Sequence, residues 1–391
     1  MSVHASSPLA LLLAAMLAAP LSAHGAAPEP TLDVRLRHES VDDRGFAQRA
    51  EATTYRLRLG LPLRFSEHWS ALLEAEHTGH LFGERYNSSA NGMGGFPLVA
   101  DPDNSEFNQG WLRYAATGWQ ATVGRQRINL GNQRFIGAVG WRQNEQTFDA
   151  LDLHWSGGSD YGLRYAFLDR VQRIFGDDHP QPLQAGWHLD SHVLEARARF
   201  AHGTLSALGL WHENRSLPQT SHRNLGLRWE GTLASGPRYH LELAQQRPYQ
   251  DAAERNRASY VAGQLALPSA AGEFSLGWER LGGDGQYAFQ TPLATLHAFN
   301  GWADRFLNTP ADGLRDAYAG WKRGFGTLSA ALVLHRFESD RDGRAYGDEL
   351  DASLGWKFAP RWNALFKVAR YRADGFAADV DKLWISVEYV H

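Results

Sequence analysis

The chain of 391 residues contains no cysteine, and this absence removes several classes of chemistry at once. Without thiols there can be no disulfide, no thiolate ligand for a metal and no cysteine nucleophile. Lysine is scarce as well, because only Lys322, Lys357, Lys367 and Lys382 occur among 39 basic residues and the rest are arginine. The planar fork of arginine suits carboxylates, so this bias fits a site for acidic ligands, although a GC-rich genome would produce the same bias.

Two further absences concern partners and membranes. The net charge of −4 and the lack of a basic tract give no general attraction to nucleic acid. Beyond the N-terminus, no run approaches the ~18 uninterrupted apolar residues that a transmembrane helix needs. Since 43 % of the residues are nevertheless hydrophobic, the apolar material must be dispersed along the chain.

The N-terminus has the features of a secretory signal, which we predict for residues 1–25. Residues 9–19 form an apolar run, Pro20 interrupts it, and small residues follow at 21–27. This run is too short to span a membrane comfortably. The first eight residues contain no Lys or Arg, so the positive start that is usual for such a signal is missing.

The remaining chain alternates apolar and polar residues at a period of two. Residues 55–65 place an apolar side chain at every odd position, and residues 31–39 and 350–358 alternate in the same way. Alternation over ~10 residues predicts a strand with one apolar and one polar face, long enough to cross a bilayer at a tilt. We count about eighteen such segments, and the weak alternation of 203–213 and 258–267 leaves sixteen as the alternative number.

The connections between these segments alternate between short and long. Turns such as 66–67 are each followed by a longer connection. Transmembrane barrels have this asymmetry because short turns face the periplasm and long loops face the exterior. We therefore predict an all-β fold, an antiparallel up-and-down transmembrane β-barrel over residues 28–391, with inward-folding loops at 79–105, 128–146 and 282–314.

In a lipid-embedded barrel the apolar phase of each strand faces outward and the alternate phase lines the lumen. The lumen phase is rich in arginine, and rings of basic residues favour the passage of anions, although ion pairing within a wet lumen would also explain these charges. The stretch 124–150, GRQRINLGNQRFIGAVGWRQNEQTFDA, adds four arginines and many amides, and we interpret it as the constriction. The candidate path residues on the strands are Arg35, Arg56, Arg58, Arg113, Arg197 and Lys367.

Two blocks of the sequence resemble the alginate export porin family of the outer membrane. They are the stretch 124–150 and TPLATLHAFNGWADRFLNTPADGLRDAYAG at 291–320, and the strand layout agrees over nearly all of the mature chain. The resemblance implies an eighteen-stranded barrel with an arginine-lined constriction through which an anionic uronate polysaccharide leaves the cell. By position, the resemblance adds to the candidate path Arg125, Arg127, Arg134, Arg142, Asn144, Glu145, Asp149 and Arg305, and its second block also contains His297, Asn300, Trp302, Asp304 and Asp312.

Together these observations predict a monomeric outer-membrane channel that passes anionic solutes, such as uronate sugars or acidic polysaccharide, by passive diffusion. The expected partners are membrane lipids, the solute and the barrel assembly machinery; no cofactor, metal site, catalytic residue or nucleic acid is expected. Two alternatives stay open. One is a barrel enzyme that hydrolyses lipids or glycans, with a Ser/His pair or a carboxylate pair such as Glu74 and Glu76. The other is a structural barrel whose loops plug the lumen.

Overall fold

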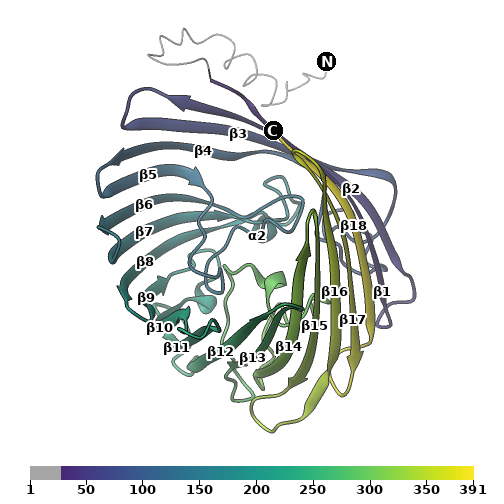
Figure 1. Cartoon of the computed structure of the whole chain (residues 1–391). Coiled ribbons are helices and arrows are strands. Elements are labelled where there is room, and N and C mark those ends of the chain that lie inside the picture. Colours follow the sequence, from purple (N-terminus) through teal and green to yellow (C-terminus); the bar gives the residue numbers. More distant parts are fainter. Residues whose placement is uncertain (1–27) are drawn as a thin grey trace, which may run out of the picture.

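The computed structural model describes residues 28–391, and the predicted signal at residues 1–25 lies outside the described residues. Eighteen strands form a single sheet in which each strand pairs antiparallel with its neighbours in the chain. The first strand, β1 (Thr31–Asp43), also pairs with the last, β18 (Val380–Val390), and this pairing closes the sheet (Figure 1). The predicted eighteen-stranded β-barrel is confirmed.

The strands between these two run up and down around the wall. In chain order they are β2 (Ala50–Arg64), β3 (Trp69–Arg85), β4 (Asn104–Ala116), β5 (Trp119–Gln126), β6 (Thr147–Gly157), β7 (Tyr161–Gln172), β8 (Gly186–Phe200), β9 (Gly203–His212), β10 (His222–Thr232), β11 (Arg238–Pro248), β12 (Ala258–Ser269), β13 (Gly272–Leu281), β14 (Leu314–Phe325), β15 (Leu328–Glu338), β16 (Ala345–Ala359) and β17 (Trp362–Ala373). The two weakly alternating segments are β9 and β12, in which glycine and alanine dilute the pattern.

Helical structure in the described chain is short. It consists of α2 (Pro182–Ala185) and two single turns of 3-10 helix, η1 (Pro218–Thr220) and η2 (Leu296–Ala298). Within residues 28–391, no helix has the length and apolar character needed to cross a membrane.

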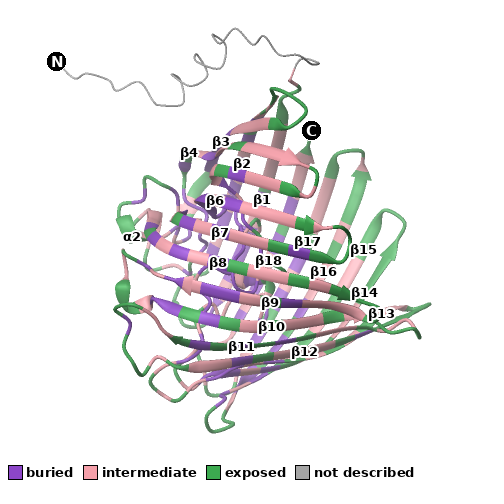
Figure 2. Ribbon diagram, turned by 90° about the vertical axis from the view of Figure 1, so that its left-hand side faces the viewer, coloured by how far each residue is buried: buried purple, intermediate pink, exposed green. Residues whose placement is uncertain are grey.

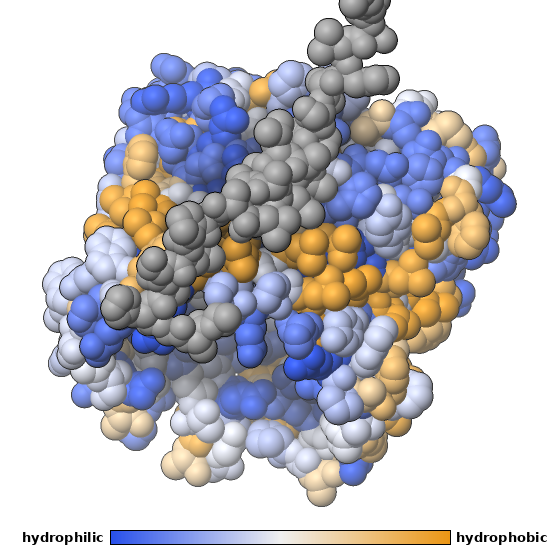
Figure 3. Space-filling model, turned by 90° about the horizontal axis from the view of Figure 1, so that it is seen from above, coloured by the Kyte–Doolittle hydropathy of each residue, from blue (hydrophilic) through white to orange (hydrophobic). Residues whose placement is uncertain are grey.

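The strands sort their side chains as the alternation predicts. On β2, Arg56 and Arg58 are almost completely buried on the lumen side, whereas Leu59 is 44 % exposed on the outer wall. Figure 3 shows a hydrophobic band across the visible face with hydrophilic residues on both sides, which suits a wall that contacts hydrocarbon. Aromatic rings such as Trp119 and Trp155, whose centroids lie 6.4 Å apart, mark the turn ends of the strands and favour the membrane interface.

The two ends of the barrel differ in the length of their connections. The end that carries Thr31 and Val390 has turns of two to five residues, and the opposite end has the longer loops. One loop is shorter than predicted: β3 continues pairing with β2 as far as Arg85, so the connection covers 86–103 rather than 79–105. We call these the turn end and the loop end.

The loop half of the lumen is filled, whereas the turn half is open. On β2 every second residue from Ala50 at the loop end to Gly60 is buried, whereas residues 61–64 before the turn are half-buried or exposed. On β14 burial likewise falls from Leu314 toward Phe325. Figure 2 shows the buried residues gathered toward the end that carries α2. The filling comes largely from the connections 127–146 and 282–313, which cross the interior in Figure 1.

These two connections form a small hydrophobic core of their own inside the lumen. Ile136 and Leu293 join them through an isolated parallel β-bridge, and both side chains are buried. Phe135 meets Phe289 and the wall residue Tyr260 edge-on, with ring centroids 6.2 and 5.9 Å apart. Burial of each such apolar side chain contributes roughly 1.5–3 kcal/mol, so the connections are packed elements rather than tethers.

Candidate solute path in the lumen

The two ends of the connection 127–146 are joined through the carboxylate of Glu145. Glu145 accepts hydrogen bonds from Arg127 and, at 2.7 Å, from Asn108 of β4, and it lies 3.4 Å from Arg58 of β2. Arg127 also contacts Glu74 of β3 at 2.8 Å. Because a guanidinium keeps its charge when buried, these partners are needed to offset its desolvation. The contacts fix both ends of the connection to β2, β3 and β4.

The apex of the same connection is held on the far wall. Arg134 is 2 % exposed; its Nε donates to Glu279 of β13 at 2.8 Å and its Nη2 donates to Asn300 at 3.0 Å. Tyr260 of β12 donates to the same Glu279 carboxylate at 2.7 Å. The connection therefore spans the lumen from β2–β4 to β12–β13.

A buried cluster of charges joins the connection to the seam between β1 and β18. Arg142 contacts Glu39 of β1 at 3.1 Å and Asp304 at 3.4 Å. Asp304 also accepts hydrogen bonds from Lys382 of β18 at 3.0 Å and from His297 at 2.7 Å. Burial raises the pKa of the Asp304 carboxyl, but its hydrogen-bonding and cationic neighbours outweigh burial and hold that pKa well below its usual value. The carboxylate is therefore ionised at neutral pH.

His297 completes this cluster as a neutral imidazole. Burial lowers the pKa of His297 to about 3, against the opposing effect of Asp304. A neutral ring suits its two contacts, since Nδ1–H can donate to Asp304 while Nε2 accepts from Lys367 of β17 at 2.7 Å. The Lys367 ammonium also lies 4.1 and 3.7 Å from the ring centroids of Trp141 and Trp302, within range for cation–π attraction.

Two predicted residues of β1 and β2 are ion-paired at the seam. Arg35 lies 2.7 Å from Glu388 of β18, and its Nη1 also donates to backbone carbonyls of residues 140–142 at 3.1–3.3 Å. Arg56 is paired with Asp33 at 2.7 Å and with Glu388 at 2.9 Å. Both guanidinium groups therefore support the wall and the connection.

Other predicted residues are engaged in the same way. Arg125 and Asp149 form a two-pronged pair between β5 and β6, with N–O distances of 2.7 and 3.1 Å. Asn144 is fully buried and donates to a backbone carbonyl at 3.5 Å, and Arg305 reaches Asp43 at 2.8 Å. The geometry assigns these residues to holding the loops in place, and their part in a solute path stays a prediction.

The open turn half of the lumen contains a cavity of about 830 Å³, whose charged lining residues include four arginines and the carboxylates Asp160, Glu195 and Glu230. Strands β4–β10 line it together with the tip of the connection 127–146. We call it the arginine chamber after its basic lining residues, which are Arg164, Arg197, Arg199 and Arg228.

These four arginines differ in their partners. Arg164 is paired with Asp152 at 2.9 Å, and Arg228 lies 3.3 Å from Glu195. The other two, on β8, are exposed, and neither lies within 4.0 Å of a carboxylate of residues 28–391. Arg197 was predicted for the path; Arg199 has the same lumen phase. The chamber therefore offers two unpaired guanidinium groups to a solute.

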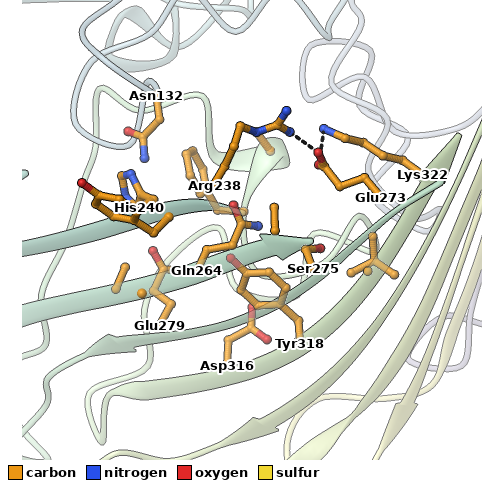
Figure 4. Close-up of a pocket in the computed structure, with 18 of the residues that line it drawn as sticks. Asn132, Arg238, His240, Gln264, Glu273, Ser275, Glu279, Asp316, Tyr318 and Lys322 are labelled. Atoms are coloured by element: carbon orange, nitrogen blue, oxygen red, sulfur yellow. Dashed lines mark ion pairs between the residues drawn. The ribbon is translucent and has the colours of Figure 1, made fainter. Parts of the chain in front are cut away.

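A second cavity of about 810 Å³ adjoins the first. It shares Asn132, Thr204 and Glu230 with the arginine chamber, so the two are continuous. We call it the tyrosine chamber after Tyr260 and Tyr318, which line it from β12 and β14. Figure 4 shows its mixed polar surface, in which both cations near the turn end, Arg238 and Lys322, are paired with Glu273.

The prediction of site residues missed most of the tyrosine chamber. Tyr260, His240 and Gln264 lie on the lumen phase of their strands, so alternation was the available signal. Arg113, which was predicted, stacks on Trp111 with its Cζ 4.3 Å from a ring centroid. Within the described residues, no group of three or more His, Asp or Glu side chains could hold a metal ion.

A closed barrel with an apolar outer wall, short turns at one end, long loops at the other and a polar lumen defines an outer-membrane porin. The chain belongs to the alginate export family, whose sequence profile matches residues 30–294. The predicted family, the outer-membrane location and contact with membrane lipids are thereby confirmed. A comparison with curated proteins finds no match.

Solved structures of similar architecture include three outer-membrane barrels. OccAB4 of Acinetobacter baumannii has a TM-score of 0.72 at 10 % identity, with 94 % of this chain and 99 % of that chain covered. OpdK of Pseudomonas aeruginosa has a TM-score of 0.69 at 16 % identity, with coverage of 93 % and 98 %. OpdL of Pseudomonas aeruginosa has a TM-score of 0.69 at 17 % identity, with coverage of 94 % and 99 %. At these identities the likeness shows the fold alone.

Proposed function

We propose that this porin passes anionic solutes, with uronate sugars or short acidic polysaccharide as the solute class, by diffusion through the arginine chamber. The observation that carries the proposal is the pair of exposed, carboxylate-free guanidinium groups of Arg197 and Arg199 on the lumen wall. Arg164 and Arg228 add positive charge around them, although their own carboxylate partners offset part of it.

The solute class follows from charge and from size. A uronate carries one carboxylate on each sugar unit, and a guanidinium binds a carboxylate through two parallel hydrogen bonds. A volume of about 830 Å³ falls within the ~300–1,000 Å³ typical of small-molecule sites, so the chamber suits a short oligomer segment. The adjoining Tyr260, Tyr318 and Gln264 supply donors and acceptors for sugar hydroxyl groups.

Reversal potentials across a planar bilayer with a salt gradient test this proposal. We expect anion preference in the wild type, and a fall in that preference toward unity in Arg197→Gln/Arg199→Gln. The control is Arg336→Gln/Arg370→Gln, which removes the same charge from outer-wall arginines paired with Asp348 and Asp381. Cation preference in the wild type, or an equal change in both double variants, would refute the role of the chamber.

A second measurement addresses the solute itself. Oligouronates added to the turn side are expected to interrupt the single-channel current, whereas neutral oligosaccharides of equal length are expected to do so less often. Removing the two chamber arginines should shorten the uronate-induced interruptions. A channel that conducts no ions in any of these experiments would instead support the plugged structural barrel.

The enzymatic alternative has one geometric candidate on the outer wall. Ser105 Oγ lies 2.7 Å from Nδ1 of His77, and Nε2 of the same ring lies 2.9 Å from the Tyr55 hydroxyl. A catalytic histidine needs a third group that orients it and stabilises its charged form, and a carboxylate does this better than a phenol. The carboxylates Glu74 and Glu76 are engaged by Arg127 and Arg58. Phospholipid turnover that Ser105→Ala abolishes would revive this alternative.

A further inference from the structure

We propose that the outer wall at β9–β11 binds a phosphate-bearing lipid headgroup through Arg223 and Arg247. The two residues lie directly opposite each other in the antiparallel pair of β10 and β11. The proposal concerns the lipid that surrounds the barrel and does not depend on which solute crosses it.

Both arginines face outward. Arg223 shares the phase of Leu225 and Leu227, which are exposed on the outer wall, and Arg247 shares that of Leu243. The intervening lumen-phase residues, such as Asn224, are buried. The two guanidinium groups therefore project from an apolar wall toward lipid and not into the lumen.

The position of the two arginines along the barrel axis matches the loop-side boundary of the apolar band. Arg247 follows the turn-end ring of Tyr239 by eight residues on β11. At ~3.3 Å per residue and a tilt of about 40°, this separation corresponds to a rise of about 20 Å. The apolar band of an outer-membrane barrel is ~25 Å tall, so long arginine side chains reach its loop-side boundary. Long loops face the exterior, so this boundary lies in the outer leaflet.

The pair lacks a protein anion. Directly opposed like charges on neighbouring strands lie ~4.5–5.5 Å apart at Cβ and destabilise a sheet. The other directly opposed pair of outward arginines in residues 28–391, Arg280 and Arg315 on β13 and β14, shares the carboxylate of Asp340 at 2.6 and 2.9 Å. Neither Arg223 nor Arg247 has a carboxylate within 4.0 Å among residues 28–391. A bound external anion would therefore relieve the repulsion.

The surroundings identify the anion as part of an amphiphile. On the turn side of the pair, the same outer face carries Leu225, Leu227 and Leu243. All three are exposed and can contact the acyl chains of a lipid. On the other side Arg223 lies opposite Trp211 of β9, an aromatic residue at the depth where headgroups meet hydrocarbon. Two guanidinium groups on directly opposed residues above an apolar wall fit a phosphorylated glycolipid of the outer leaflet, whose phosphate they would bind through paired hydrogen bonds.

Native mass spectrometry of the full barrel in detergent micelles tests this site, with diphosphoryl lipid A as the probe. The same lipid without its phosphates and free inorganic phosphate provide the comparison arms. We expect the wild type to bind the diphosphoryl lipid at least tenfold more tightly than the dephosphorylated lipid, and millimolar phosphate to leave the complex intact. Arg223→Gln/Arg247→Gln should lose at least tenfold in affinity, whereas Arg336→Gln/Arg370→Gln should stay within twofold of the wild type.

Three results would overturn the proposal. They are equal binding of the two lipids by the wild type, equal loss in the two double variants, and displacement by inorganic phosphate, which would show a site for a free anion. The wild-type comparison of the two lipids decides the question even where a variant fails to fold.

Discussion

Neutralising Glu279 should detach the apex of the connection 127–146 from the far wall. In Glu279→Gln, the Arg134 guanidinium remains buried without its carboxylate partner, and it cannot lose its charge by deprotonation. Breaking a buried pair by removing one partner costs about 3–5 kcal/mol. With a tenfold change for each ~1.4 kcal/mol, the detached fraction should rise roughly a hundredfold to several thousandfold.

Amide hydrogen exchange measures this rise at the two places where the apex is bonded. The Leu130 amide donates to the carbonyl of Ile136 at 3.1 Å, and the Gly137 amide donates to that of Leu293 at 2.9 Å. Both amides should exchange at least a hundredfold faster in Glu279→Gln. Arg134→Met/Glu279→Gln, which removes the stranded charge as well, should return most of the protection. Acceleration below tenfold, or no recovery in the double variant, would refute the assignment of this pair as the anchor of the apex.

Three further outcomes follow from other contacts. Burial lowers the pKa of His297 to about 3 from an unfolded value of ~6.5, so the free energy of unfolding should fall as pH drops from ~6.5 to ~3. Denaturant unfolding at several pH values measures this free energy, and its dependence on pH should be weaker in His297→Asn. An unchanged pH dependence would contradict the neutral ring. Phe306→Ala removes a ring from an aromatic cluster in which the ring centroids of Phe306 and Phe337 lie 4.6 Å apart. The free energy of unfolding should fall by about 3–5 kcal/mol in the same assay, and a fall below ~1 kcal/mol would argue against tight packing. A Cβ on Gly162 would lie 2.5 Å from Arg197 Nε, so Gly162→Ala should push the guanidinium into the arginine chamber and lower single-channel conductance. The control is Gly94→Ala, a change in the loop 86–103 with open space around its Cβ.

Alternation carried the fold prediction because a tilted transmembrane strand is a local feature. Residues 55–65 show their two faces without reference to any other segment, and β2 is found there. The phase of Arg197 also follows from its own strand. Local information failed where pairing extended a strand, as with β3, whose residues beyond 78 are held in the sheet by β2.

The contents of the lumen could not be predicted in the same way. The partner of Arg134 lies 145 positions away, and that of Arg35 lies 353 positions away, so neither pair leaves a trace in local sequence. The number of arginines near 124–150 indicated a charged loop in the lumen region. The sequence alone could not distinguish arginines that form ion pairs inside the barrel from those, such as Arg199, that have no carboxylate partner among residues 28–391. That distinction depends on which carboxylates the closed barrel brings alongside.

The contacts of Arg35 couple the completion of the barrel to the seating of its contents. This one side chain bridges β1 to Glu388 of β18 and also holds the carbonyls of residues 140–142. A chain halted before the last strand arrives would have both an open strand edge and a loosened inner loop. Conversely, sideways parting of the finished seam would disturb the lumen as well as the wall. The contacts of Arg35 at the β1–β18 seam therefore stabilise the closed wall and the inner loop together.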